Sequence, residues 1–259
     1  MRRFLALLLL PACLSVQAAE WKDSPELARL FRQEGITGTF IVHDLANDRY
    51  TVHDRKRAET RYIPASTFKI ANSLIGLSTG VVANVDQVLP YGGGPTRRPE
   101  WAHDMSLRDA IRISNLPLYQ NMARRIGIER MRTGVRQLEY GNMDPGSVVD
   151  TFWLDGPLKI SAYEQTVFLD KLVRDALPVP KDTMAAVRAI LRQEGSAELY
   201  AKTGWGVPPD GGDIGWWVGW VNKDGKLYTF ALNLDIPDDA AGAKRVPLGK
   251  ASLQALGLL

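Results

Sequence analysis

The strongest constraint on this chain is a serine and a lysine three residues apart at the start of an apolar, helix-forming stretch. Ser66 and Lys69 follow Pro64 and precede the run Ile-Ala-Asn-Ser-Leu-Ile at positions 70–75. Residues i and i+3 share one face of a helix, so we expect the Lys69 amine to reach the Ser66 hydroxyl. A serine beside a local base is a candidate nucleophile. Because a chain of this length contains about one S-x-x-K by chance, the other motifs decide the interpretation.

The order of the predicted elements indicates an α/β (α+β) fold. With 259 residues, 45 % of them hydrophobic, the chain can bury a full core. Strand patterns lie at residues 37–42, 49–52, 198–203, 215–221 and 227–234, and turn residues predict hairpins for the first two and the last two. Helical patterns lie at residues 25–33, 65–77, 105–111, 118–126, 128–138, 163–176, 181–192 and 246–259.

We expect residues 20–259 to form a single domain with two lobes. An α/β lobe takes about residues 20–60 and 180–259, and an inserted all-helical lobe takes about residues 61–179. Residues 140–160 are predicted to form a long loop, of a length that is usually functional or flexible.

The N-terminus has the pattern of a secretory signal peptide over residues 1–19. Met-Arg-Arg precedes an apolar run to Val16, and small residues follow, with a cleavage site near Ala18 or Ala19. A membrane anchor is the alternative, but about 13 apolar residues interrupted by Pro11 are short for a bilayer. We therefore expect export to the periplasm and no membrane attachment after cleavage.

Loss of this segment changes the chemistry of the mature chain. The single cysteine, Cys13, is removed, which leaves neither disulfides nor a thiol nucleophile. Residues 10–13, Leu-Pro-Ala-Cys, resemble a lipoprotein processing site, although Pro11 is unfavourable for that alternative. Removal of Arg2 and Arg3 leaves 30 basic and 29 acidic residues, a net charge of +1. This balance gives no electrostatic reason to expect nucleic acid as a partner.

The histidines give no sign of a metal site. His43, His53 and His103 are scattered and show no H-x-x-x-H or H-x-H spacing. A metal site needs clustered ligands, so the sequence argues against a metalloenzyme.

Three short elements follow Ser66 along the chain. They are Ser114-Asn115-Leu116 at or after a helix end, Tyr140-Gly141-Asn142 at the start of the long loop, and Lys202-Thr203-Gly204 at the end of a strand. K-[ST]-G alone is expected about 0.1 times in a chain of this size. Its occurrence on a strand downstream of S-x-x-K is far rarer, so the ordered set favours an acylation site.

In this combination the sequence resembles the penicillin-recognising serine enzymes, whose signature is S-x-x-K, a second serine motif and K-T-G. Within them it resembles the class D β-lactamases, or oxacillinases. The matching segments are Pro64-Ala65-Ser66-Thr67-Phe68-Lys69, Tyr140-Gly141-Asn142, residues 153–161 and Lys202-Thr203-Gly204-Trp205. The resemblance implies a β-lactamase/transpeptidase-like fold, with an antiparallel sheet flanked by helices plus the helical lobe. It also implies an enzyme that hydrolyses β-lactams and confers resistance to them.

Chemistry assigns the first roles. Ser66 attacks a carbonyl and forms an acyl-enzyme, and its proton passes to a base. Lys69 can be this base only when it is not an ammonium, and burial lowers the pKa of a lysine because desolvation disfavours the charged form. The apolar surroundings are expected from Phe68, Leu116, Trp153 and Leu154.

The resemblance implies that Lys69 is modified. Class D enzymes carboxylate this lysine with CO2 to N6-carboxylysine, and the carbamate, hydrogen-bonded by the tryptophan that matches Trp153, activates Ser66 and the deacylating water. CO2 or bicarbonate is therefore required, and no other cofactor or metal is expected. By the same resemblance, Ser114 relays a proton to the leaving β-lactam nitrogen.

The resemblance also implies the substrate contacts. Lys202 and Thr203, in the motif that ends with Gly204, bind the substrate carboxylate, and Arg245 is a second cation beside it. The substrate is a small-molecule β-lactam, and the enzyme is expected to be a monomer or a homodimer.

The resemblance implies further contacts that complete the expected site. The backbone N–H groups of Ser66 and Trp205 form the oxyanion hole. The matching residue lies near the rim in similar enzymes, so we expect Trp101 to contact the substrate side chain. Leu116 stands where the class usually has valine, which alters water access to Lys69. The loop contains no E-x-x-L-N, which argues against a class A mechanism.

Alternatives exist for single residues and for the whole chain. Ser66 also suits a helix cap, Ser114 a plain helix end, Trp153 core packing and Arg245 a solvated surface. For the chain, the alternatives are a penicillin-binding D,D-peptidase of low turnover and a non-enzymatic β-lactam sensor domain. Sensors of that kind have several upstream transmembrane helices, whereas a signal peptide precedes this domain, so the sensor is disfavoured.

Overall fold

The computed structural model describes residues 19–195, 198–209 and 211–259. Residues 1–18, on which the predicted signal peptide falls, lie outside the described part of the chain. Within the described part, no helix combines the length and the apolar composition that a membrane span requires.

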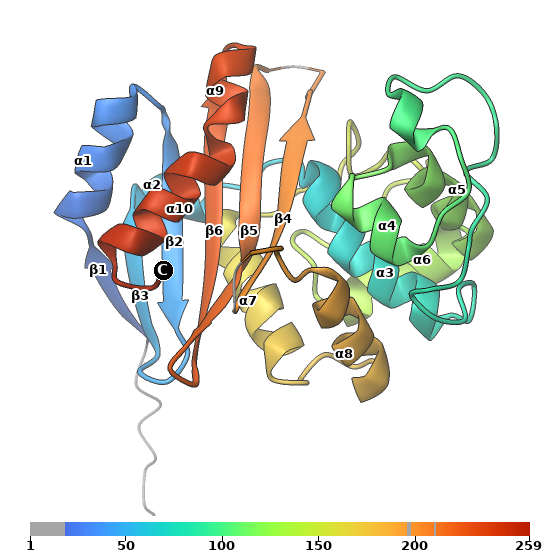
Figure 1. Ribbon diagram of the computed structural model, residues 1–259, viewed down its shortest axis with the longest axis horizontal. Coiled ribbons are helices and arrows are strands. Elements are labelled where there is room, and N and C mark those ends of the chain that lie inside the picture. The colour runs from blue at the N-terminus through green and yellow to red at the C-terminus, as the bar shows by residue number, and fades with distance from the viewer. Residues whose placement is uncertain (1–18, 196–197, 210) are drawn as a thin grey trace, which may run out of the picture.

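A six-stranded sheet forms the centre of the α/β lobe (Figure 1). Its strands are β1 (Glu20–Asp23), β2 (Gly38–Asp44), β3 (Arg49–His53), β4 (Leu199–Gly206), β5 (Asp213–Lys223) and β6 (Lys226–Ile236). The strand order is β1-β3-β2-β6-β5-β4, and neighbours are antiparallel except for the parallel pair β1 and β3. The two predicted hairpins are confirmed as β2–β3 and β5–β6, whereas the short strand β1 has no signal in the sequence pattern.

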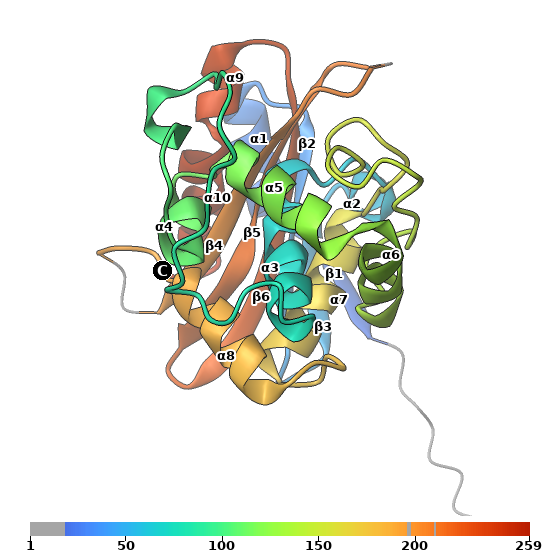
Figure 2. The same cartoon turned by 90° about the vertical axis from the view of Figure 1, so that its right-hand side faces the viewer.

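Helices cover both faces of the sheet and build a second lobe beside it, which confirms the predicted fold class (Figure 1 and Figure 2). Their bounds are α1 Pro25–Glu34, α2 Arg55–Glu59, α3 Lys69–Ser78, α4 Leu107–Arg112, α5 Leu116–Ile126, α6 Ile128–Gln137, α7 Ala162–Val173, α8 Lys181–Ile190, α9 Asp239–Ala243 and α10 Arg245–Ala255. Two 3-10 turns, η1 (Ala65–Phe68) and η2 (Pro99–Trp101), complete the set. Ser106 accepts from the Asp109 N–H at 3.1 Å, as expected of the N-cap of α4.

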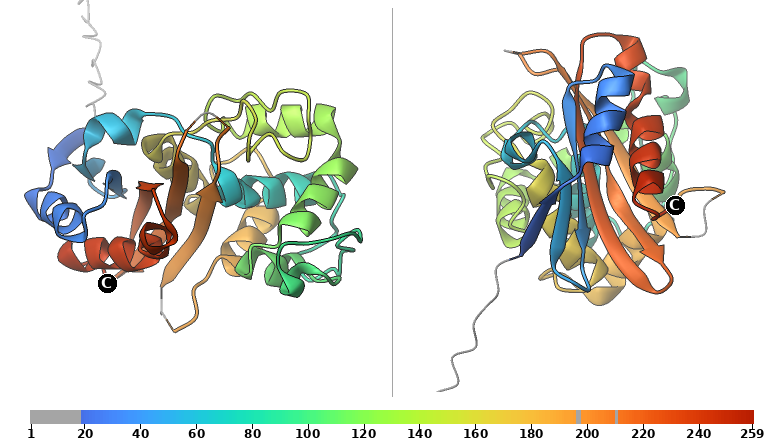
Figure 3. Two further views of the ribbon diagram at one scale, coloured as in Figure 1. Left: turned by 90° about the horizontal axis from the view of Figure 1, so that it is seen from above. Right: turned by 90° about the vertical axis from the view of Figure 1, so that its left-hand side faces the viewer.

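Burial on both faces explains the apolar composition of the central strands. In β2, Phe40 and Val42 belong to the core under α1 and α10, whereas Ile41 belongs to the core on the opposite face. Successive strand residues point to opposite faces, so a strand covered on both sides is apolar throughout. Trp216 and Trp217 in β5 divide between the two cores in the same way. Figure 3 shows helices on both sides of the sheet.

Helix α7 differs from its predicted place. The sequence pattern assigns residues 61–179 to the helical lobe, but α7 packs on the sheet against β2, β5 and β6. Phe168 and Leu169 enter the core there, and Asp170 accepts from the Thr229 hydroxyl of β6 at 2.6 Å. Position along the chain does not reveal which surface a helix covers, so the lobe boundary is wrong for this helix.

Helix α3 is the buried axis of the helical lobe. Every residue from 69 to 76 is buried, and α5, α6 and α8 pack around it (Figure 2). Apart from Lys69, Asn72 and Ser73, these residues are apolar or glycine, which suits a helix that is covered on all sides. The turn η1 at its start packs against strand β4, so the first residues of this stretch lie where the two lobes meet.

Candidate active site

The candidate nucleophile and its base are in contact. Lys69 Nζ lies 2.8 Å from Ser66 Oγ, as the spacing predicts. The local backbone differs from the single predicted helix, because Ala65–Phe68 form a 3-10 turn and α3 begins at Lys69. In a 3-10 turn, side chains i and i+3 are in line, which favours this contact. Ser66 is partly exposed, whereas Lys69 is 1 % exposed.

Hydrogen bonds from separate parts of the chain hold this turn. The Ala65 N–H donates to the Trp153 carbonyl at 2.9 Å, and the Thr67 hydroxyl donates to the Pro64 carbonyl at 2.7 Å. The side-chain amide of Gln165 on α7 donates to Thr67 Oγ1 at 2.8 Å. Ala65 has a φ of 49°, a left-handed conformation that costs an L-residue about 1 kcal/mol. The surrounding bonds therefore keep a strained backbone in place.

An aromatic ring lies near the Lys69 amine, and the ring of the residue that precedes Lys69 stacks on another. Phe68 and Trp153 stack with their centroids 5.4 Å apart, and Lys69 Nζ lies 5.3 Å from the centroid of the Tyr119 ring. Burial, followed by the positive charge of Lys202, holds the pKa of Lys69 well below its usual range. These surroundings favour the neutral amine, which is the form that can accept a proton.

The indole N–H of Trp153 is buried and has no acceptor among the described residues. A buried donor without a partner costs about 1–3 kcal/mol, so such an atom is a candidate for contact with a ligand or a modification. Trp153 is joined to the turn by its carbonyl bond to Ala65 and by its stacking on Phe68, the residue before Lys69.

Lys202 joins the two lobes at the site. Its Nζ on β4 donates to Ser114 Oγ at 3.0 Å and to the Thr203 carbonyl at 2.9 Å. Burial, followed by the positive charges of Arg245 and Arg98, lowers the pKa of Lys202 to about 7. Both protonation states of Lys202 are therefore accessible near neutral pH.

Ser114 occupies a tight turn between α4 and α5. Its φ is 58°, and the next residue, Asn115, caps α5 by accepting from the Leu118 N–H at 3.0 Å. The Asn115 side chain also donates to the Trp101 carbonyl at 3.2 Å. The turn is therefore a helix boundary, and it is also the position from which Ser114 meets Lys202.

A cavity of about 690 Å³ opens onto these residues. Eight predicted site residues line it: Ser66, Trp101, Ser114, Leu116, Thr203, Gly204, Trp205 and Arg245. Lys69, Trp153 and Lys202 do not line it, because each is buried. The fold thus brings residues of both lobes to one cavity.

The cavity wall also contains residues that the motifs do not predict. They are Arg97, Arg98, Glu100, Arg112, Ile113, Val207 and Asp213, beside Leu154, which was expected as an apolar neighbour. The short sequence distance to Trp101 is a signal that could have found Arg97 and Arg98. Asp213 has no such signal, because its position depends on how β5 pairs with β4.

Arg245 is not a solvated surface residue. It is half-buried, donates to the Gly204 carbonyl at 2.5 Å and lies 5.0 Å from the centroid of the Trp205 ring. Trp205 in turn donates its indole N–H to Asp213 at 2.7 Å. A Cβ on Gly242 would lie 2.5 Å from this ring, so glycine is needed there. Arg245 and Trp205 therefore form one packed unit at the wall.

The Tyr140-Gly141-Asn142 motif holds the long loop that carries Trp153. The Asn142 side chain donates to the Pro157 carbonyl at 2.7 Å and accepts from the Lys159 N–H at 3.0 Å. Gly141 has a φ of 56°, and a Cβ there would lie 2.1 Å from the Lys159 carbonyl oxygen. This motif acts on the site through the position of the loop.

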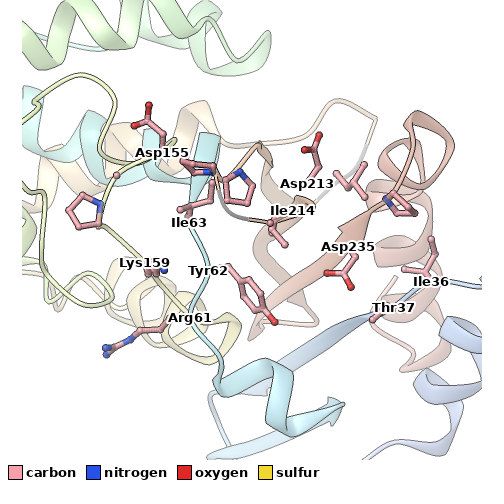
Figure 4. A pocket seen from close by; sticks show the side chains of 18 of the residues that line it. Ile36, Thr37, Arg61, Tyr62, Ile63, Asp155, Lys159, Asp213, Ile214 and Asp235 are labelled. Atoms are coloured by element: carbon pink, nitrogen blue, oxygen red, sulfur yellow. The ribbon is translucent and has the colours of Figure 1, made fainter.

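A larger cavity of about 1040 Å³ lies nearby, and Figure 4 shows its lining. None of the predicted site residues lines it. Its charged side chains include Arg61, which pairs with Glu164 at 2.5 Å, and Asp235, which pairs with Arg57 at 2.6 Å. These charges are neutralised locally, and no serine–lysine contact is present among the residues that line it.

The chain is similar to known proteins along most of its length. A family model described as the penicillin binding protein transpeptidase domain matches residues 38–254. Beta-lactamase OXA-10 of Pseudomonas aeruginosa is 36 % identical over 257 residues, which cover 97 % of this chain and 95 % of that protein. Beta-lactamase OXA-48 of Klebsiella pneumoniae is 36 % identical over 233 residues, which cover 88 % of this chain and 87 % of that protein.

A solved structure extends this similarity to the fold. The crystal structure of FUS-1 (OXA-85), a class D β-lactamase from Fusobacterium nucleatum subsp. polymorphum, matches with a TM-score of 0.88 and 39 % identity. The match covers 92 % of this chain and 100 % of that chain. On sequence and fold together, the chain belongs to the class D β-lactamases and is an enzyme of that class.

Proposed function

We propose that this β-lactamase forms its acyl-enzyme on Ser66 and that Lys69, carboxylated by CO2, is the base in acylation and deacylation. The observation that carries the proposal is the 2.8 Å contact between Lys69 Nζ and Ser66 Oγ, made by a lysine that is 1 % exposed. A base in contact with a serine hydroxyl is the arrangement that nucleophilic catalysis requires.

The surroundings of Lys69 support its carboxylation. CO2 reacts with a neutral amine, so that a nitrogen–carbon bond forms and a proton leaves to solvent. The lowered pKa of Lys69 favours this neutral form. Trp153 supplies a buried N–H donor that has no acceptor among the described residues. Once present, the carbamate provides an anionic oxygen that can accept a proton.

Ser114 and Lys202 are placed to return a proton to the β-lactam nitrogen. When the ring opens, the carbon–nitrogen bond breaks and the nitrogen takes up a proton. Ser114 lies on the cavity wall, and its hydroxyl accepts from Lys202 Nζ at 3.0 Å. A lysine whose pKa is lowered to about 7 gives up its proton near neutral pH, which suits general acid catalysis.

The part of the cavity wall that contains Thr203 and Arg245 suits an anionic substrate. Thr203 and the half-buried Arg245 line the cavity, with Lys202 behind them. Cationic donors form charge-assisted hydrogen bonds with a carboxylate. The packing of η1 against β4 supports an oxyanion hole from the backbone N–H groups of Ser66 and Trp205, a contribution of about 3 kcal/mol per donor.

Turnover of nitrocefin with and without bicarbonate tests the mechanism. Enzyme depleted of CO2 at acidic pH should lose turnover and regain it on addition of bicarbonate. A 13C NMR carbamate signal from labelled bicarbonate should appear in the native enzyme and be absent from Lys69→Ala. Full turnover in CO2-free buffer, without such a signal, would overturn the carboxylation.

The Ser66→Ala variant tests the nucleophile. It should retain the 13C signal and lose hydrolysis. Mass spectrometry of the native enzyme with penicillin distinguishes a β-lactamase from a D,D-peptidase. A β-lactamase should release the hydrolysed product rapidly, whereas a covalent adduct that persists for hours would indicate a D,D-peptidase.

We also propose export to the periplasm and a resistance phenotype. The positive, apolar and small-residue order of residues 1–19 supports export. Expression of the full chain in a susceptible Gram-negative host should yield cleaved protein in the periplasmic fraction and raise the inhibitory concentration of penicillins. A Ser66→Ala chain should be exported equally and give no protection.

A further inference from the structure

One side of the active-site cavity carries two arginines whose charges the described residues leave largely uncompensated. Arg97 and Arg98 line the cavity from the loop before η2. Arg98 has a carboxylate nearby, that of Glu100, but at 3.9 Å and with both side chains more than half exposed. A pair of this kind contributes little. Among the described residues, the Arg97 side chain forms neither a hydrogen bond nor an ion pair.

The other charged groups of the wall are already engaged. Arg112 lies 3.1 Å from a carboxylate oxygen of Glu194, and Asp213 accepts the Trp205 indole N–H at 2.7 Å. Arg245, with Lys202 behind it, is the cation assigned to the carboxylate of the substrate ring. Arg97 and Arg98 thus add further positive charge to the same cavity, and the Arg98 charge also reaches Lys202 and Arg245.

Trp101 determines which part of a substrate meets this region. The Arg98 guanidinium lies 5.2 Å from the centroid of the Trp101 ring, and the Arg98 carbonyl accepts from the Trp101 N–H at 3.0 Å. The Trp101 indole N–H donates to the Ile113 carbonyl at 3.2 Å, so the ring that supports Arg98 is fixed. A substrate side chain that reaches Trp101 therefore also reaches Arg98.

The shape of a penicillin matches the two positive regions. Its ring carboxylate and its acylamino side chain lie at opposite ends of the bicyclic nucleus. We place the ring carboxylate at Arg245 and Lys202, as in the proposed function, and direct the acylamino side chain along the cavity wall toward Trp101. A carboxylate on that side chain is then placed beside Arg98.

We infer that Arg98, assisted by Arg97, forms a second anion subsite that favours β-lactams with a carboxylate on the acylamino side chain. This inference rests on the proposed function, since it uses the Ser66 and Arg245 ends of the same cavity. Arg98 touches the substrate and acts on specificity. The ring carboxylate, which all penicillins share, remains with Lys202 and Arg245.

Carbenicillin and benzylpenicillin test the subsite, because they differ only by a carboxylate on the side chain. The measured quantity is the ratio of kcat/KM for carbenicillin to kcat/KM for benzylpenicillin. Arg98→Gln should lower this ratio about threefold, because the loss of one partly exposed charge pair has an effect of this size. The Arg97→Gln/Arg98→Gln double variant should lower the ratio further. Arg98→Lys, which keeps the charge, should retain most of the ratio.

A matched control and a salt series complete the test. Arg108→Gln removes an exposed arginine that pairs with Asp86 outside this cavity and should leave the ratio unchanged. The ratio should fall with added salt in the native enzyme and vary less in the double variant, because salt screens exposed charges. An unchanged ratio in the double variant, with benzylpenicillin still hydrolysed, would overturn the subsite alone. Failure of the native enzyme to hydrolyse benzylpenicillin would overturn the proposed function.

Discussion

Lys202 Nζ lies 3.0 Å from Ser114 Oγ, and this hydrogen bond connects strand β4 of the sheet with the turn between α4 and α5 in the helical lobe. The active-site cavity lies where these two parts of the molecule meet. Any change in how the lobes pack therefore alters the distance between Lys202 and Ser114, the proposed proton donor and relay. The chemistry at Ser66 depends on this packing as well as on its own turn.

Ser114 and Lys202 are expected to act as one unit. Ser114→Ala and Lys202→Ala should each lower kcat/KM for nitrocefin about 100-fold, because each interrupts proton transfer to the leaving nitrogen. The double variant should lose little more than either single variant, since residues that act together are not additive. Lys226→Ala, at an exposed position, is the control. Fully additive losses would show that the two side chains act separately.

The pKa of Lys202 predicts the alkaline limb of the pH profile. With a pKa near 7 in the free enzyme, Lys202 is an ammonium below about pH 7 and loses its proton above it. Anionic substrates need this charge, so kcat/KM for nitrocefin should fall at alkaline pH, with bicarbonate kept saturating. The negative charge of a carbamate on Lys69 favours the ammonium form of Lys202, so this limb should lie above pH 7. Lys202→Arg remains charged and should lack this limb at a lower overall rate. A flat native profile between about pH 6 and 9 would contradict the assignment.

Trp153→Phe should separate packing from hydrogen bonding. The substituted ring can still stack on Phe68, but the unpaired indole N–H is gone, so we expect the Tm to stay within a few degrees of the native value. The bicarbonate concentration for half-maximal activity should rise at least tenfold, because the carbamate loses its donor. Trp220→Phe, in a ring stacked on Tyr200, is the matched control and should not change the bicarbonate requirement. An unchanged requirement in Trp153→Phe would contradict the proposed contact.

A buried histidine makes stability depend on pH. His43 Nδ1 lies 2.7 Å from Asp170 and Nε2 lies 3.0 Å from Asp48. Burial alone would lower the pKa of His43, but the hydrogen bonds and charges of Asp170 and Asp48 outweigh it and raise the pKa above 6.5. The resulting stability is fully present below pH 6.5 and is lost as pH rises through the higher folded-state pKa.

Asp170→Asn measures this contribution. At pH 6 the variant should lose about 3 kcal/mol in the free energy of unfolding, because one charge of a buried pair is left without its partner. The loss should be smaller at pH 9, where less of His43 carries a positive charge. Urea unfolding at both pH values measures the difference, and Asp86→Asn, at an exposed ion pair, is the control. An equal loss at both pH values would contradict a charged His43.

Much of the local structure was predictable because it depends on neighbours in the sequence. The i, i+3 contact of Ser66 with Lys69, the Ser106 cap and the two hairpins follow from short-range geometry and turn chemistry. The exception is the backbone at Ser66, where a 3-10 turn replaces the start of the predicted helix. Its strained Ala65 is held by the hydrogen bond that its N–H donates to the carbonyl of Trp153, a residue distant in the sequence.

The sequence by itself determined the residue types of the site, the order of its motifs and most elements of the sheet and helices, because these depend on side-chain chemistry and local periodicity. Tertiary structure alone decided that α7 covers the sheet, that Lys202 meets Ser114 and that Arg97 and Arg98 face the cavity of Ser66. Each of these depends on how separated segments pack, which no local pattern encodes. Burial likewise belongs to the packed molecule, and it lowers the pKa of Lys69 and isolates the indole N–H of Trp153.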